Sequence, residues 1–162
     1  MDIESTVRWL KDRELIKELP LRYARGIDRI DFDLVRSNFH PDCQVFGTVV
    51  SGPLDPYLDW TENELRKYES TLHVMGNQYV DLEEGADEGH VETYAVAYQM
   101  QTEESGLEDL ILGLRYCDDV ARFDEGWLIT ARTAVPQWVR GPVPHAPDEL
   151  RSTWHGKTLR NE

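Results

Sequence analysis

The feature that most constrains the fold is a change from helical to extended patterning after Ser70. Beyond this residue the chain is rich in Val, Ile, Tyr, Thr and Trp, which favour β-structure. Short Gly-containing connections separate the extended segments, so neighbouring strands are expected to pair antiparallel as hairpins. We therefore predict a four-stranded meander whose strands cover residues 71–84, 89–102, 107–123 and 127–140.

The predicted strands are unusually long. The first spans 14 residues, whereas about 5–6 is typical of globular proteins. Long strands fit a compact domain when the sheet twists or bends, and a bulge is the usual local device for bending. We expect bulges at Gly76 or Gly113.

The first part of the chain carries helical patterns. Apolar residues recur mostly every three or four positions over residues 2–28, which predicts one amphipathic helix. Pro20 lies inside it and removes a backbone donor, so we expect a kink or break near Leu19. Asp31 can cap a short second helix, which residues 40–42 would end.

A short extended piece at 43–50, a turn at 51–53 and a third helix at 54–69 complete the segment before the strands. Helices followed by strands are typical of an α+β domain with helices against one face of an antiparallel sheet. Three prolines near the end of the chain prevent regular structure there. We therefore expect one domain over 1–140 and an irregular tail over 141–162 that packs on its own subunit or a neighbouring one.

Composition excludes several partners. The 162 residues include 31 Asp and Glu against 17 Lys and Arg, a formal charge of -14. Such a surface repels phosphate backbones and anionic lipids, so neither nucleic acid nor membrane is expected as a partner. The sequence shows no leader-like apolar segment, which favours a cytoplasmic protein. Cys43 and Cys117 stand at no metal-ligand spacing and are expected to be free thiols.

Three segments resemble one family in order and spacing. They are residues 21–42, from Leu21-Arg22-Tyr23 to His40-Pro41-Asp42, residues 72–77, Leu-His-Val-Met-Gly-Asn, and the closing residues 115–132. They are similar to SnoaL-like proteins of the nuclear transport factor 2-like superfamily, over about residues 5–140. The resemblance implies a cone-shaped α+β barrel, cystatin-like, in which a curved antiparallel sheet is closed by N-terminal helices around a pocket.

The residue pattern suggests a general base. His73 lies early in the first long strand, and by the two-residue period Met75 and Asn77 share its face. If that face is concave, all three line the pocket. Asp28 follows Tyr23 by five positions, and unwinding at the helix end would let both reach the pocket. A carboxylate that accepts the imidazole N–H would make an Asp28–His73 pair a positioned base.

Family members with related patterns include scytalone dehydratase, bile acid 7α-dehydratase and lindane dehydrochlorinase. The resemblance implies that Asp28 and His73 are catalytic, that Tyr23 donates a proton or hydrogen bond, and that Arg132 stabilises negative charge. Each has a structural alternative: His73 as a satisfied strand residue, Tyr23 as core, and Arg132 in a salt bridge. Large side chains that either line the cavity or fill the core are Phe46, Trp60, Tyr116 and Trp138.

No nucleotide-binding motif and no zinc-ligand spacing occurs in the sequence, so no cofactor and no metal is expected. His90 is expected beside a turn, outside the cone. The first functional hypothesis is a cofactor-independent lyase or isomerase, dehydratase-like, that acts on a small, largely apolar cyclic substrate. A hydrolase would need an Asp–Arg–Asp arrangement in the pocket.

The alternative is a non-catalytic ligand-binding or assembly module that resembles the small subunit of ring-hydroxylating dioxygenases. In that case side chains would fill the pocket, and Asp28 and His73 would point apart. Under either hypothesis the resemblance implies a homo-oligomer, a trimer before a dimer.

Overall fold

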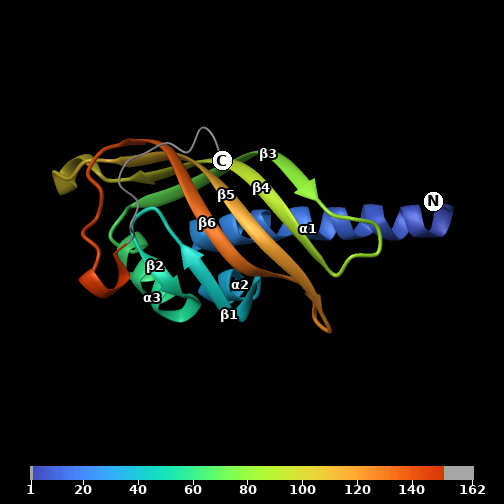
Figure 1. Ribbon diagram of the computed structural model, residues 1–162. Helices are drawn as coiled ribbons and strands as arrows, with labels where there is room; N and C mark the ends of the chain where they lie inside the picture. Colours follow the sequence, from blue (N-terminus) through green and yellow to red (C-terminus); the bar gives the residue numbers. More distant parts are fainter. Residues whose placement is uncertain (1, 152–162) are drawn as a thin grey trace.

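The computed structural model describes residues 2–151 (Figure 1). Three α-helices and a six-stranded sheet form the fold, and two short 3-10 helices lie in its loops. In chain order the elements are α1 (Ile3–Arg29), α2 (Phe32–Arg36), β1 (Phe39–Phe46), β2 (Ser51–Pro53), α3 (Leu54–Leu65), β3 (Ser70–Asp81), β4 (Glu88–Met100), η1 (Glu103–Ser105), β5 (Leu110–Phe123), β6 (Gly126–Arg140) and η2 (Asp148–Leu150).

The sheet contains the predicted meander and two further strands. Its order is β2-β1-β6-β5-β4-β3, and the pairs from β3 to β6 are antiparallel. The short piece before α3 joins this sheet, because β1 pairs parallel with β6 and antiparallel with β2. Residues 51–53, predicted as a turn, are therefore a strand, and the turn lies before them, where the Gly47 N–H bonds to the Val50 carbonyl.

α1 crosses the sheet, and its N-terminal end reaches beyond the strands (Figure 1). The helix continues through Pro20, so the expected break near Leu19 is wrong. A proline inside a helix costs about 3 kcal/mol, while each fully buried large apolar side chain contributes about 1.5–3 kcal/mol. Ile16, Leu19 and Ile27 are all buried on the sheet side, and their combined contribution exceeds that cost.

The second helix begins as predicted. The Asp31 side chain accepts a hydrogen bond from the Leu34 N–H at 3.0 Å and caps α2. The helix ends at Arg36, earlier than expected, because residues 40–42 already belong to β1.

Two bulges bend the sheet near the predicted glycines. The register between β3 and β4 shifts between Met75 and Gln78, next to Gly76. The register between β5 and β6 shifts after Gly113, where Gln137 is the extra residue on β6. A bulge increases the local twist of a strand. The concave side of the resulting sheet faces α1 and α3, and the core lies between them.

None of the helices over residues 2–151 is long and apolar enough to span a bilayer.

Candidate active site

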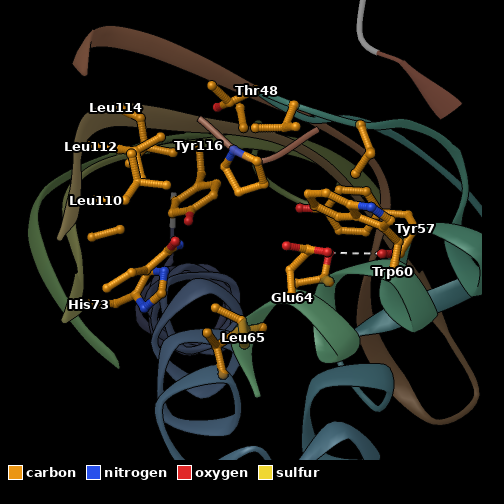
Figure 2. Close-up of a pocket in the computed structure, with 18 of the residues that line it drawn as sticks. Thr48, Tyr57, Trp60, Glu64, Leu65, His73, Leu110, Leu112, Leu114 and Tyr116 are labelled. Atoms are coloured by element: carbon orange, nitrogen blue, oxygen red, sulfur yellow. Dashed lines mark hydrogen bonds between the residues drawn. The ribbon is translucent and has the colours of Figure 1, made fainter. Parts of the chain in front are cut away.

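A cavity of about 100 Å³ lies between the concave side of the sheet, α1 and α3 (Figure 2). That volume holds several water-sized groups rather than one. Leucines of β5 form much of its apolar wall, and aromatic side chains come from α1, α3 and β5. His73 and Glu64 are the lining residues that carry an imidazole and a carboxylate. The residues that line the cavity include Tyr23, Tyr57, Trp60, Glu64, Leu65, His73, Leu110, Leu112, Leu114 and Tyr116.

Asp28 and His73 are in direct contact. The His73 Nδ1 lies 2.7 Å from Asp28 Oδ1, and the backbone N–H of His73 donates to both Asp28 oxygens at 3.1 and 2.9 Å. The His73 side chain is only 4% exposed, so the ring is almost fully buried. With Nδ1 donating to the carboxylate, a neutral imidazole keeps its basic lone pair on Nε2.

The helix positions Asp28 without unwinding. Asp28 belongs to the last turn of α1, close to the first residues of β3, and Tyr23 lies on the cavity side of the same intact helix. The expected break at the helix end is therefore unnecessary. Of the pair, His73 lines the cavity, and Asp28 is not among the lining residues.

Three buried tyrosines, Tyr23, Tyr57 and Tyr116, line the cavity. The Tyr23 ring centroid lies 6.4 Å from that of His73 and 5.5 Å from that of Tyr116. Burial raises the pKa of Tyr23 well above its ordinary value, and the nearby Tyr116 adds to this shift while Arg132 opposes it. Burial also raises the pKa of Tyr57 and of Tyr116. All three are neutral phenols at physiological pH and can donate hydrogen bonds.

Tyr57 and Glu64 had no assigned role in the sequence interpretation. The available signal was their spacing, because Tyr57, Thr61 and Glu64 recur at intervals of three and four residues in the predicted third helix. That signal left the packing face open. In the structure, Trp60 and Leu65 of the same helix line the cavity as well.

Arg132 forms a buried salt bridge with Asp118. Its Nε and Nη2 each donate to one Asp118 oxygen at 2.7 Å, and both side chains are 0% exposed. Burial opposes the guanidinium charge, but the Asp118 carboxylate outweighs it and the pKa of Arg132 is raised. Arg132 does not line the cavity. Its guanidinium lies behind the wall, with Cζ 4.1 Å from the Tyr23 ring centroid and 4.5 Å from that of Tyr116.

Four predicted lining residues lie outside the cavity. Asn77 is exposed because the bulge beside Gly76 turns the next inward position to Gln78, whose Nε2 donates to the Lys17 carbonyl at 2.9 Å. Met75 packs against the core without reaching the cavity.

The other two are aromatic. Phe46 is 55% exposed at the end of β1, where alternation turns it away from buried Val45. Trp138 is 44% exposed, and its indole covers Gly113 so closely that a Cβ there would lie 2.2 Å from the ring. By contrast, Trp60 and Tyr116 do line the cavity.

Nothing over residues 2–151 resembles a metal site: no group of three or more His, Cys, Asp or Glu side chains gathers there. Cys43 and Cys117 are free, and burial raises the pKa of Cys43 to about 12 and that of Cys117 to about 11. His90 lies away from the cavity, where its Nδ1 is 3.0 Å from Asp119 Oδ1.

Comparison with known families agrees with this architecture. Residues 8–133 match the model of the SnoaL-like domain. The chain belongs to the SnoaL-like family. A comparison with curated proteins found no match.

Solved structures of other proteins share the fold of this SnoaL-like chain. A candidate scytalone dehydratase from Novosphingobium aromaticivorans is 19% identical, with a TM-score of 0.71, 96% of this chain and 100% of that chain covered. The hexachlorocyclohexane dehydrochlorinase LinA-type3 from Novosphingobium barchaimii is 16% identical, with a TM-score of 0.70. The match covers 88% of this chain and 98% of that chain. The Kfla4162 protein from Kribbella flavida is 20% identical, with a TM-score of 0.71, and the match covers 80% of this chain and 93% of that chain.

Proposed function

We propose that this SnoaL-like protein is a lyase or isomerase that needs no cofactor and abstracts a proton from carbon in a small, largely apolar cyclic substrate. The observation that carries the proposal is the 2.7 Å contact between Asp28 and His73 at the wall of an apolar cavity. A carboxylate that holds one imidazole nitrogen makes the other nitrogen a positioned base.

The reaction can be written with the groups present. His73 Nε2 takes a proton from a carbon next to a carbonyl or opposite a leaving group, and the C–H electron pair becomes a C=C bond. In an elimination of water, the departing hydroxide takes the proton of the Tyr23 phenol, so that alkene and water are released. Proton transfer from the imidazolium back to the phenolate restores the site. In an isomerisation, the proton returns to another carbon.

Tyr23 is suited to the acid role because it lines the cavity beside His73, with 6.4 Å between the ring centroids, and a neutral phenol can donate to negative charge that develops there. The guanidinium of Arg132, 4.1 Å from the centre of that ring, then stabilises the phenolate. Arg132 is thus a positioning residue in this proposal, since Tyr23 lies between it and the cavity.

Two further observations favour catalysis over the ligand-binding or assembly module. The module predicts a filled pocket and a separated Asp28 and His73, whereas the cavity is open and the two side chains touch. In addition, two of the similar structures are described as a candidate dehydratase and a dehydrochlorinase, and both names denote eliminations.

Proton abstraction can be tested without the natural substrate. Small cyclic ketones in deuterated buffer exchange the hydrogens next to the carbonyl when a base removes them, and NMR follows the loss of signal. We expect wild-type protein to accelerate exchange above buffer and His73→Ala to lose at least 100-fold of that acceleration.

His90→Ala is the matched control, since His90 also pairs with an aspartate but lies outside the cavity. Equal exchange by wild-type protein and His73→Ala would refute the assignment of the base. Circular dichroism of both variants checks that the fold is intact.

A further inference from the structure

The cavity contains a second polar group whose place the proposed reaction does not explain. Glu64 is the only carboxylate among the described residues that line it. It lies on the last turn of α3, one residue before the helix ends, whereas His73 belongs to β3. In Figure 2 the two labelled side chains come from different sides of the cavity. A bound molecule therefore meets a base on one side and an acceptor on another.

The surroundings of Glu64 are costly for a carboxylate. Its side chain is only 17% exposed, and the next residue along the helix is Leu65, a lining residue. One oxygen, Oε1, accepts a hydrogen bond from Lys67, whose own side chain is 61% exposed. A carboxylate has about four acceptor positions, and removing them from water without partners is unfavourable.

A purely structural role explains this placement poorly. A Glu–Lys pair three residues apart at a helix end forms equally well with both side chains in water, and it stabilises a helix only slightly. Glu62 on the same helix pairs with Arg66 four residues on, and its side chain is 31% exposed and does not line the cavity. Glu64 instead presents its carboxylate to the cavity and leaves the exposed position to Lys67.

We infer that Glu64 is a specificity residue that accepts a hydrogen bond from a donor group of the substrate, a hydroxyl or an ammonium, while a carbon elsewhere in the same ring faces His73. The inference rests on the proposed function for the reacting end of the molecule. It narrows the substrate class to small rings that are apolar along their sides and carry a donor away from the acidic C–H.

Matched cyclic probes test this assignment directly. Cyclohexanone lacks a donor, 4-hydroxycyclohexanone adds a hydroxyl, and protonated 4-piperidone adds an ammonium; binding of each is followed by protein-observed NMR titration. We expect wild-type protein to bind a donor-bearing probe about tenfold more tightly than cyclohexanone, the usual size of a charge-assisted hydrogen bond. The probe with the greater gain identifies the donor.

Substitutions then show which residue causes the tighter binding of the donor-bearing probes. Glu64→Leu is expected to abolish the preference for donor-bearing probes and to leave the affinity for cyclohexanone within about twofold of that of wild type. Glu64→Gln keeps an acceptor oxygen, so it should retain part of the gain for the hydroxyl and lose that for the ammonium. Glu62→Gln is the matched control and should bind like wild type. Lys67→Met separates the salt bridge from the subsite, because it should preserve or increase the preference.

The results distinguish this inference from the proposed function. A preference that Glu64→Leu removes, in a protein that catalyses no exchange, supports the subsite and overturns the lyase or isomerase assignment. Exchange that depends on His73 in a protein that binds all three probes equally overturns the subsite alone. A preference unchanged in Glu64→Leu also overturns it.

Discussion

The buried pair of Arg132 and Asp118 allows a demanding test of how this fold is stabilised. In Arg132→Met the Asp118 carboxylate remains in a site with no solvent exposure and loses both of its 2.7 Å donors. Leaving one buried ion of such a pair uncompensated costs about 3–5 kcal/mol. Loss of the guanidinium from the faces of Tyr23 and Tyr116 adds roughly 0.5–2 kcal/mol.

The double variant Asp118→Val/Arg132→Met is the informative comparison. It removes both charges, and it also removes the buried Arg132 Nη1, which has no hydrogen-bond partner within the described residues. Replacement of a buried ion pair by apolar side chains of similar volume is often neutral or stabilising. We therefore expect the double variant to recover most of the free energy of unfolding that Arg132→Met loses.

Urea unfolding followed by tryptophan fluorescence and circular dichroism, at one fixed protein concentration, measures these differences. If Arg132→Met does not fold, the double variant still decides the question. A loss below about 1 kcal/mol in Arg132→Met, or a double variant no more stable than the single one, would refute the reasoning.

Three further predictions concern the base, a buried carboxylate and assembly. Asp28→Asn is expected to lower catalysed exchange by about 100-fold or more, with Asp119→Asn, from the exposed His90 pair, as its control. Asp12 accepts bonds from Arg122 and Trp127, chiefly Arg122, which lowers its pKa below the ordinary 3.8. The stabilisation that the Asp12 carboxylate contributes is therefore present above pH 3.8 and is lost as the pH falls through its pKa in the folded state. Urea unfolding should show Asp12→Asn to be less stable than wild type at pH 7 and to approach wild-type stability in acid. The homo-oligomer, a trimer before a dimer, stays a prediction that light scattering checks. We propose the exposed apolar side chains of β3 and β4, among them Val74, as its interface, so Val74→Glu should weaken assembly.

Much of the fold could be predicted because local patterns and tertiary packing agree. The four strands of the meander have the residue types, lengths and Gly-containing turns of hairpins, and the structure confirms each of them. The Asp31 cap is a local hydrogen bond and was predictable for the same reason. Pro20 was misleading because its local cost is real, but burial of the helix face outweighs it.

The parallel pairing of β1 with β6 had no local signal. Parallel partners are far apart in sequence and are joined by no turn whose residues indicate the pairing. Half of β1 is exposed as well, so its apolar pattern is weak. Likewise, nothing local distinguishes an arginine that lines a pocket from one that lies behind its wall. Asp118, the partner that holds Arg132, is adjacent only across the β5–β6 register.

Two of the wrong lining residues share one physical cause. Counting by twos from His73 places Asn77 inside the cone. Trp138 was predicted only as a large side chain that lines the cavity or fills the core, but on β6 the same two-residue period would give it the inward face of Ala134 and Pro136. A bulge intervenes in each strand, between Met75 and Gln78 on β3 and at Gln137 on β6, and one extra residue exchanges the two faces of everything beyond it. The bulges that the glycines predict are therefore also the points at which face assignment must be inverted. His73 precedes the bulge in β3, so its assignment depends only on the undisturbed part of the pattern.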